Sequence, residues 1–304
     1  MTVSLKNRSF LSISDLIAEE LSHVLSTAAK QKKGKMPQVL AGKSIALLFE
    51  KPSLRTKASF DVAVDQLGGH PIYFGPQEIG LGQRESISDV AQTTSRFVQG
   101  IIARVFTHSS IVELTKHSTV PVINALSDGE HPCQALADLL TIHEKKGGLK
   151  GVRIAFIGDG NNVASSLAQG ACMLGADFVI ASPVGYELPK AVQTTAKKSG
   201  GSFLQVTDPK DAVKGADVVY TDVWASMGQE KDSAQRANAF KGYGVTSELM
   251  ALAKKDAIFM HDLPAHRGEE VTDAVIDSKQ SVVFDQAENR LHAQRALLSL
   301  IFAK

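Results

Sequence analysis

The sequence predicts an α/β protein of two domains, each a parallel sheet flanked by helices. Short apolar runs of strand length alternate with helical patterns along the whole chain, which is typical of parallel α/β architecture. A glycine-rich segment, residues 147–151, interrupts this alternation near the middle of the chain. The 304 residues, 43% of them apolar and 21% charged, are enough for two globular domains of ordinary size.

Three strand-like runs and one weaker run occupy the first half of the chain. They have the length and the apolar composition of buried strands. Helices are predicted to begin near Ser53 and near His131, and the glycine Gly68 favours a stop for the first of them. The strong runs are residues 44–49, 101–106 and 120–125, and the weaker one is residues 71–74.

The second half repeats the alternation after the glycine-rich segment. We therefore expect one domain over residues 1–147 and a second over residues 148–304. Apolar residues at helical spacing predict a final helix over residues 286–303. The strands expected in this half are residues 152–157, 177–182, 202–206, 216–221 and 257–261.

Composition excludes several classes of function. A formal net charge of +1, without a one-sided block of charge, gives no electrostatic reason to expect a nucleic-acid or membrane partner. No apolar stretch approaches the roughly 20 residues that span a bilayer, and residues 1–8 lack the apolar core of a signal peptide. Cys133 and Cys172 are too few for a disulfide framework or a structural zinc site. We expect a cytoplasmic protein.

Residues 49–57 place two hydroxyls and three cations where a predicted strand is followed by a helix. Ser53 falls at the helix N-terminus, where backbone N–H groups and the helix dipole favour an anion. Arg55 can add a bidentate guanidinium, and the hydroxyls of Ser53 and Thr56 can donate to further phosphate oxygens. An ordinary serine N-cap among solvated charges explains the same residues about equally well.

Five further groups of polar residues follow predicted strands, at the edge where parallel sheets bind ligands. Each alone has a structural explanation: His131 could be a hydrogen-bonded residue near a helix start, and Asn161 a helix cap. For His261 we favour the role of a buried, hydrogen-bonded residue at a strand end. Five such groups together favour a binding site. They are Arg104 with residues 107–108, and residues 127–134, 158–162, 221–228 and 261–268.

Gly158 and Gly160, between a strand and a helix, raise a dinucleotide-binding alternative. The third glycine position of that fingerprint is Val163, and the next strand ends in residues 181–183 without the acid that would bind a ribose hydroxyl. NAD is therefore the weaker alternative. Because no Walker-type glycine loop is present either, a small phosphate compound is favoured over a nucleotide.

The motifs, in this order and spacing, resemble those of the aspartate/ornithine carbamoyltransferase family, and of its ornithine carbamoyltransferase branch. The resemblance covers nearly the whole chain. The phosphate motif is shared with aspartate carbamoyltransferases, whereas Ser226-Met227-Gly228 is typical of the ornithine branch. The matching residues are Ser53 to Thr56, Arg104, residues 131–134, residues 158–162, Asp222, residues 226–228, residues 261–268 and residues 288–290.

The resemblance implies transfer of the carbamoyl group of carbamoyl phosphate to the side-chain amine of L-ornithine, giving L-citrulline and phosphate, in arginine metabolism. It implies no metal and no cofactor, since amine attack beside a good leaving group needs positioning and donors for the developing oxyanion. It also implies that the C-terminal helix packs back on the first domain, and that the protein forms a homotrimer or a multiple of trimers.

The same resemblance assigns the site residue by residue. The residues with implied catalytic roles are Arg55, Arg104, His131 and Asp262. Those implied to bind carbamoyl phosphate are Ser53, Leu54, Arg55, Thr56, Arg84, Arg104, His131, Gln134, Leu263 and Arg290, with Arg84 reaching the site of a neighbouring subunit. Those implied to bind ornithine are Asn162, Asp222, Ser226 and Met227.

Two positions depart from the family pattern. Leu54 replaces the usual threonine, which should matter little because its backbone N–H remains available. Asp262 replaces a cysteine that contacts the reacting amine. Its negative charge would raise the pKa of the amine by favouring the ammonium form, unless Asp262 itself accepts the proton. The alternatives are therefore a carbamoyltransferase for another amine, such as putrescine or acetylornithine, and a catalytically weak homologue.

Overall fold

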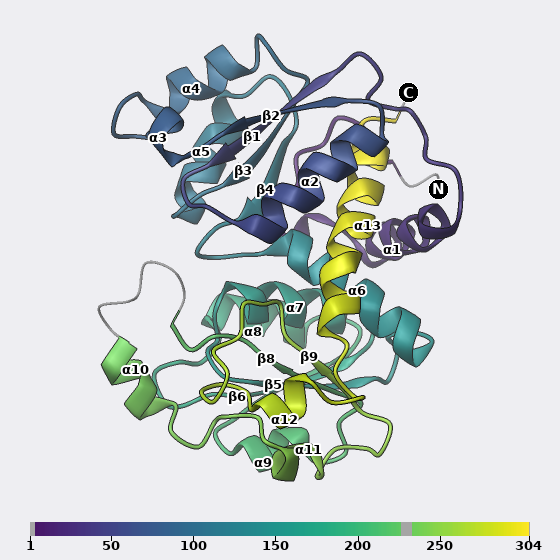
Figure 1. The fold of residues 1–304 in the computed structure, drawn as a ribbon, viewed down its shortest axis with the longest axis vertical. Coiled ribbons are helices and arrows are strands. Elements are labelled where there is room, and N and C mark those ends of the chain that lie inside the picture. The colour runs from purple at the N-terminus through teal and green to yellow at the C-terminus, as the bar shows by residue number, and fades with distance from the viewer. Residues whose placement is uncertain (1–3, 226–232, 304) are drawn as a thin grey trace. The chain divides into compact units, whose positions relative to one another are not determined.

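The structure is a computed structural model that describes residues 4–225 and 233–303. It divides into two compact units, which are described separately (Figure 1). Unit 1 comprises Met1–Leu140 with Glu288–Lys304, and unit 2 comprises Thr141–Ala287. Each unit contains one parallel sheet flanked by helices, so the predicted fold class is confirmed. The domain limits at residues 147 and 148 remain a prediction.

Unit 1 has a four-stranded sheet in the order β2-β1-β3-β4. All three pairings are parallel, and Phe49 at the end of β1 is in register with Arg104 at the end of β3. The strands are β1 (Ser44–Phe49), β2 (His70–Phe74), β3 (Gly100–Arg104) and β4 (Val122–Leu126). The helices are η1 (Ile13–Asp15), α1 (Ala18–Lys33), α2 (Leu54–Gln66), α3 (Pro76–Ile79), α4 (Ile87–Thr94), α5 (His108–His117) and the first part of α6 (Pro132–Lys146).

The central strands of unit 1 are continuous apolar runs because helices cover them on both faces. Every residue of β3 is buried, and so are residues 45–49 of β1. Helix α2 contributes Phe60, Ala63 and Val64, all buried at helical spacing. This packing holds the carboxyl ends of β1 and β3, and the start of α2, in one place.

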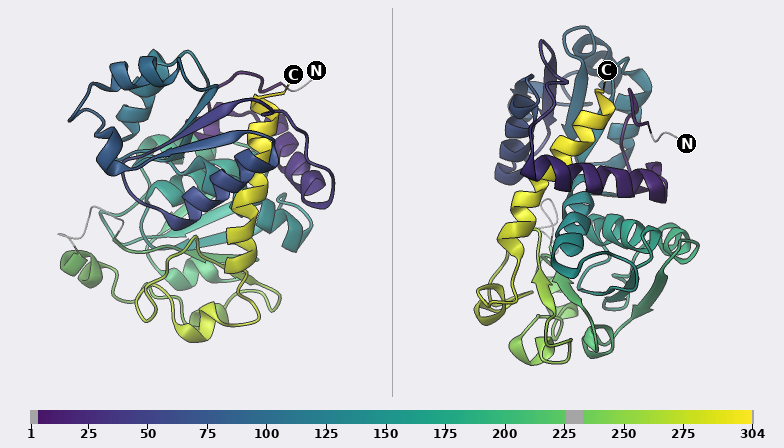
Figure 2. Two further views of the ribbon diagram at one scale, coloured as in Figure 1. Left: turned by 45° about the horizontal axis from the view of Figure 1, so that its top comes forward. Right: turned by 90° about the vertical axis from the view of Figure 1, so that its right-hand side faces the viewer.

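The C-terminal helix α13 (Val283–Ile301) returns to unit 1, as expected. Gln31 of α1 donates to the hydroxyl of Ser299 at 2.8 Å, and Arg295, which is 1% exposed, donates to the side chain of Gln66 at the end of α2. Figure 2 shows α13, in yellow, beside both helices. The last helix of the chain is therefore part of the core of the first unit.

Unit 2 has a five-stranded parallel sheet in the order β7-β6-β5-β8-β9. All five predicted strands are present, some of them shortened at their ends. They are β5 (Arg153–Ile157), β6 (Asp177–Ala181), β7 (Ser202–Val206), β8 (Val218–Thr221) and β9 (Ile258–Met260). The helices are α7 (Asn162–Met173), α8 (Lys190–Lys197), α9 (Pro209–Val213), α10 (Ser233–Ala239), α11 (Ser247–Met250) and α12 (Asp273–Ile276).

The strand order of unit 2 brings the carboxyl ends of β5, β8 and β9 side by side. Phe156 and Tyr220 stack across β5 and β8 with ring centroids 5.2 Å apart, which fixes these two strands in register. Three of the predicted polar groups follow these three strands. Among the described residues, no helix is long and apolar enough to cross a membrane.

Candidate active site

The hydroxyl of Thr56, in the first turn of α2, is the centre of a polar cluster in unit 1. The Ser53 hydroxyl lies 3.1 Å from it, Nη2 of Arg290 donates to it at 3.1 Å, and Nη1 of Arg104 donates to it at 3.5 Å. Thr56 and Arg290 are 234 residues apart in the sequence. We call Ser53, Thr56, Arg104 and Arg290 the Thr56 cluster.

Ser53 takes both of the roles that the sequence left open. It is the N-cap of α2, and its hydroxyl accepts the Thr56 N–H at 3.4 Å. The same hydroxyl lies beside the Thr56 side chain that the two arginines contact. Capping fixes the end of the helix, where the N–H groups of the first turn favour an anion. A cap and an anion site are therefore compatible at this position.

Two guanidinium groups are buried in the Thr56 cluster. Arg104 is 6% exposed and Arg290 is 3% exposed. Nη1 of Arg290 donates to Oε1 of Gln134 at 2.5 Å, and the Gln134 amide donates in turn to Asp138 at 2.8 Å. Positive charge is felt more strongly at such a weakly hydrated place than in water. The cluster therefore has the charge and the donors that bind a phosphate group.

His131, between β4 and α6, is buried and sits in the field of these cations. Burial is the main cause that lowers the pKa of the imidazole well below its usual value, and the charges of Arg290, Arg104 and Lys51 lower it further. The ring is therefore neutral near pH 7. A neutral imidazole can donate one hydrogen bond to a carbonyl oxygen without bringing a positive charge of its own.

The cations of residues 49–57 differ in their surroundings. Lys57 forms an ion pair with Asp61 at 2.7 Å, and its ammonium lies 4.8 Å from the ring centroid of Tyr73. Lys51 lies over the ring of Phe106 and contributes to the field at His131. The family resemblance assigns no role to Lys51. Its position between the predicted strand and the helix was the one feature of the sequence that could have indicated its place near His131.

Three other predicted phosphate residues lie at or near the surface. The side chain of Leu54 is 79% exposed, so the backbone N–H is what this position can offer to a ligand in unit 1. Arg55 follows it in the first turn of α2 and is partly exposed. Arg84 donates to the carbonyl of Glu78 at 3.2 Å, within its own exposed loop. That contact does not join Arg84 to the Thr56 cluster.

Asp222, directly after β8, is the centre of a second polar cluster, in unit 2. Its Oδ2 accepts from the Asn161 amide at 2.7 Å, and its Oδ1 accepts the Val223 N–H at 2.7 Å. Asn161 is also the N-cap of α7, since its Oδ1 accepts the N–H groups of Val163 and Ala164 at 3.0 Å. The cap thus orients an amide toward Asp222.

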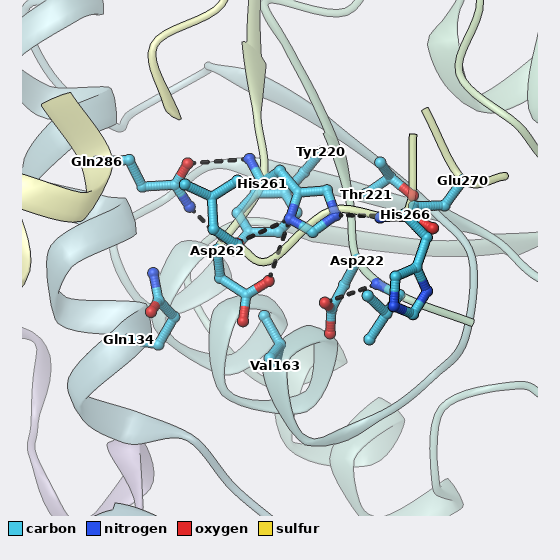
Figure 3. Close-up of polar contacts among 12 residues, drawn as sticks. Gln134, Val163, Tyr220, Thr221, Asp222, His261, Asp262, His266, Glu270 and Gln286 are labelled. Carbon is cyan, nitrogen blue, oxygen red and sulfur yellow. Dashed lines mark hydrogen bonds and ion pairs between the residues drawn. The ribbon is translucent and has the colours of Figure 1, made fainter. Parts of the chain in front are cut away.

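Asp262 follows β9 and lies beside Asp222 (Figure 3). Burial is the main cause that raises the pKa of Asp222 well above its ordinary value, and the carboxyl group of Asp262 raises it further. The predicted ornithine residue Asn162 is next to this cluster, where its Oδ1 accepts the Val163 N–H at 3.1 Å. Ser226 and Met227, also predicted to bind ornithine, lie outside the described residues.

His261 is a buried, hydrogen-bonded residue at the end of a strand, as favoured from the sequence. Its Nε2 lies 3.1 Å from Oε1 of Glu270, which is also buried. The N–H of Leu263 donates to its Nδ1 at 2.9 Å, and Leu263 has φ of 60°, a left-handed conformation that is uncommon for a leucine. His261 and Glu270 therefore fix the backbone that carries Asp262 and Leu263.

Gly160 is one of the two glycines that raised the dinucleotide-binding alternative, and the structure gives it a packing role. A Cβ at this position would lie 2.4 Å from the backbone carbon of Glu187 and from the nitrogen of Leu188. The glycine is required because two stretches of backbone approach closely here, and Gly160 donates its N–H to Tyr186 at 2.8 Å. Packing within unit 2 accounts for this residue without a cofactor.

The fold and the two clusters define a two-domain α/β protein with buried arginines at a helix N-terminus in one unit and a carboxylate cluster in the other. The family model described as the carbamoyl-P binding domain of aspartate/ornithine carbamoyltransferase matches residues 8–144. The model of the Asp/Orn binding domain of the same family matches residues 150–301. The chain belongs to the aspartate/ornithine carbamoyltransferase family.

Individual relatives match this chain over nearly its full length. The chain is 53% identical to the anabolic ornithine carbamoyltransferase of Pyrococcus furiosus, over 99% of this chain and 98% of the relative. The solved structure of ornithine carbamoyltransferase from the same organism superimposes with a TM-score of 0.94, covering 99% of both chains. An acetylornithine transcarbamylase solved with acetylcitrulline is 33% identical, with a TM-score of 0.88 over 98% of this chain and 100% of that one.

Proposed function

We propose that this protein transfers the carbamoyl group of carbamoyl phosphate to the side-chain amine of L-ornithine, giving L-citrulline and phosphate. The observation that carries the proposal is the Thr56 cluster, in which two buried arginines and a helix N-terminus meet at one hydroxyl. The name of the Pyrococcus furiosus relative, at 53% identity, supports ornithine as the acceptor and the anabolic direction.

The residues of unit 1 suit the electrophilic half of this reaction. Ser53, Arg55 and Arg104 bind the phosphate of carbamoyl phosphate and stabilise the charge that builds on it as it leaves. Thr56 and His131 donate to the carbonyl oxygen, which becomes an oxyanion when the amine attacks. Because the pKa of His131 is lowered, it does so as a neutral donor near pH 7.

Further residues of unit 1 complete this half of the site. Arg290 orients Gln134, the neighbour of the carbamoyl end. Leu54 offers its backbone N–H, and Arg84 contacts phosphate in the site of a neighbouring subunit. Positioning of this kind can supply on the order of 7–11 kcal/mol of the barrier, so the reaction needs no protein nucleophile.

The residues of unit 2 suit the acceptor. Asn162, Asp222, Ser226 and Met227 bind the amino-acid end of ornithine, and the Leu263 carbonyl orients the carbamoyl NH2. Asp262 is adjacent to the reacting amine. We assign residues 1–147 to the carbamoyl-phosphate domain and residues 148–304 to the ornithine domain, and the matches of the two family models over residues 8–144 and 150–301 support this division.

We further propose that the protein is cytoplasmic and forms a homotrimer or a multiple of trimers. Size-exclusion chromatography with light scattering tests the assembly, and the result expected is a mass that is a multiple of three chains. A monomer that retains full activity would contradict both the trimer and the role of Arg84 across subunits.

The activity is tested by supplying carbamoyl phosphate with ornithine, acetylornithine, putrescine, lysine or aspartate in parallel reactions. We expect a carbamoylated product with ornithine and much less with the other four. Product with acetylornithine or putrescine alone would replace the acceptor and keep the carbamoyl transfer. No product with any acceptor would overturn the enzymatic proposal.

A further inference from the structure

The guanidinium of Arg236, in α10, joins the loops that follow two neighbouring strands of the unit 2 sheet. Its Nη1 donates to Oδ2 of Asp159, after β5, and to the carbonyl of Trp224, after β8, both at 2.7 Å. The side chains of Arg236 and Asp159 are 13% and 11% exposed, so this ion pair has little water around it. Removing one partner of such a pair is costly, because the other charge is left buried and unpaired.

Aromatic side chains hold the guanidinium of Arg236 in place. Its Cζ lies 5.0 Å from the ring centroid of Tyr186, a cation–π distance. Phe240 is fully buried, and its ring centroid lies 4.9 Å from that of Tyr186 and 5.7 Å from that of Trp224. The carbonyl of Tyr186 in turn accepts the N–H of Gly160 at 2.8 Å. We call Asp159, Tyr186, Trp224, Arg236 and Phe240 the Arg236 anchor.

The carboxylate of Asp159 depends on this arginine. Burial raises the pKa of Asp159, whereas the hydrogen bond and the positive charge of Arg236 lower it. Without the guanidinium, this carboxyl group would be buried without its cation. It would then take up a proton or turn toward water. Either change disturbs the turn that follows β5.

The two loops that the anchor joins carry residues assigned to the acceptor. Asn161 and Asn162 belong to the same turn as Asp159. Asp222 belongs to the same loop as Trp224. The amide of Asn161 donates to Asp222 at 2.7 Å, so the two loops also meet at the Asp222 cluster. The anchor is therefore placed to orient these groups from behind.

We propose that Arg236 is a positioning residue for the acceptor: by joining the loops after β5 and β8, it holds Asn162 and Asp222 in the geometry that binds the amino-acid end of ornithine. This inference rests on the proposed function. A displacement of about 1 Å in a group that positions a substrate can cost about 10²-fold in rate. Arg236 acts through the two loops, and the carbamoyl-phosphate residues of unit 1 do not depend on it.

Steady-state kinetics with each substrate varied in turn test this role. Arg236→Gln should lower kcat/KM for ornithine by about 10²-fold. It should leave kcat/KM for carbamoyl phosphate unchanged. Arg236→Lys retains a cation beside Asp159 and should lose less, although it lacks the planar fork. An unchanged kcat/KM for ornithine in Arg236→Gln would overturn the proposal, and so would equal losses for the two substrates, which indicate a general effect on folding.

Arg153→Gln is the matched control. Arg153 lies at the start of β5, at the opposite end of that strand from Asp159, and donates to backbone carbonyls of α9. Its kinetics with both substrates should equal those of the wild type. If Arg153→Gln lowers kcat/KM for ornithine as much as Arg236→Gln does, the loss of any arginine from unit 2 has this effect and the proposal fails.

A double-mutant cycle tests whether Arg236 acts through Asp159. Asp159→Asn removes the carboxylate and leaves the guanidinium. If the two residues form one connection, the Asp159→Asn/Arg236→Gln double variant should lose no more kcat/KM for ornithine than the worse of the two single variants. Losses that multiply in the double variant would show that the residues act independently, and would overturn the connection.

The fluorescence of Trp224 provides a readout that needs no turnover, because the sequence contains one tryptophan. Arg236 fixes the carbonyl of this residue, so Arg236→Gln should make the indole more accessible to acrylamide and raise its quenching constant. Arg153→Gln should not. Equal quenching in all three proteins would overturn the anchor even if activity falls. If Arg236→Gln raises quenching but the wild type carbamoylates no acceptor, the proposed function fails and the anchor stands.

Discussion

Burial shifts the pKa values of two site residues in opposite directions. Burial and three nearby cations lower the pKa of His131, so its ring is neutral near pH 7, whereas burial and a second carboxyl group raise the pKa of Asp222. Perturbed groups of this kind are concentrated at functional sites. Here Asp222 is the centre of one polar cluster, and His131 lies in the electrostatic field of the arginines of the other.

The two hydrogen bonds of the Arg290 guanidinium should matter more for activity than its positive charge does. The guanidinium donates to both Gln134 and Thr56, which the single ammonium of a lysine cannot reproduce. We expect Arg290→Lys to lower kcat/KM for carbamoyl phosphate by about 10²-fold, the loss that a small misplacement of the groups around the reacting centre can cause. Steady-state kinetics at varied carbamoyl phosphate measure this.

Arg153→Lys is the matched control for that substitution, because Arg153, at the start of β5 in unit 2, donates to backbone carbonyls of α9. Its kinetics should equal those of the wild type. An unchanged kcat/KM in Arg290→Lys would remove Arg290 from the site. An equal loss in both variants would point to a general effect on folding.

At the scale of elements, the strand cores were predictable and their ends were not. Residues 44–49 were predicted residue for residue, because a strand covered on both faces is a continuous apolar run. Residues 202–206 were also predicted with their observed limits, although β7 is a partly exposed edge strand. The predicted strand 120–125 begins late, at Val122, because Pro121 has no N–H to donate. The predicted strand 101–106 ends early, at Arg104, and the N–H of Phe106 bonds to the carboxylate of Glu50 instead.

A strand end of the same kind forms part of the candidate site. β9 stops at Met260, although residue 261 was expected to continue it, because the His261 N–H donates to the side chain of Gln286 at 3.0 Å. Hydrogen bonds to side chains cannot be read from hydrophobic periodicity. The positions at which strands end are therefore the part of the fold that the sequence predicts least well.

The turn after β5 gives a test of element packing. Gly160→Ala would bring a Cβ to 2.4 Å from the backbone of residues 187–188, which cannot move without displacing the chain. We expect a loss of about 1–3 kcal/mol in the free energy of unfolding, as for other overpacked sites. Urea denaturation measures it.

Gly200→Ala is the control for this test, because its Cβ would meet only ordinary contacts, the shortest at 3.8 Å. It should change stability by less than about 0.5 kcal/mol. Equal stabilities of the two variants would show that the 158–162 turn accommodates a side chain, and would remove the packing explanation for its second glycine.

At the scale of the whole molecule, the fold class and the family followed from motifs, but the spatial groupings of the candidate site residues did not. Arg290 contacts Thr56 although the two are 234 residues apart, and the spacing of residues in the sequence cannot predict such a contact. The adjacency of Asp222 and Asp262 depends on β8 and β9 being neighbours in the sheet. Asp262 was identified as a departure from the family, whereas its partner became visible only in the folded chain.

The two perturbed groups should give stability opposite dependences on pH. His131 has a lowered pKa, so the unfolded chain binds its proton first and stability is lost as pH falls below about 6.5. Asp222 has a raised pKa, so the folded chain holds its proton longer and stability is lost as pH rises from about 3.9 toward that raised value. In thermal melts, the melting temperature of His131→Asn should vary less with pH than that of the wild type below about pH 6.5. The melting temperature of Asp222→Asn should vary less than that of the wild type above about pH 3.9. Melting curves parallel to the wild type at every pH would contradict both assignments.

The return of α13 to unit 1 has a consequence for the order in which the protein is made. A chain is synthesised from its N-terminus, and its first domain can begin to fold while the rest is still being added. Arg290, together with the residues of α13 that pack against α1 and α2, is added only after the whole of unit 2. A chain that stops within unit 2 therefore contains Ser53, Thr56 and Arg104 without Arg290. The Thr56 cluster can form only after the second unit has been synthesised.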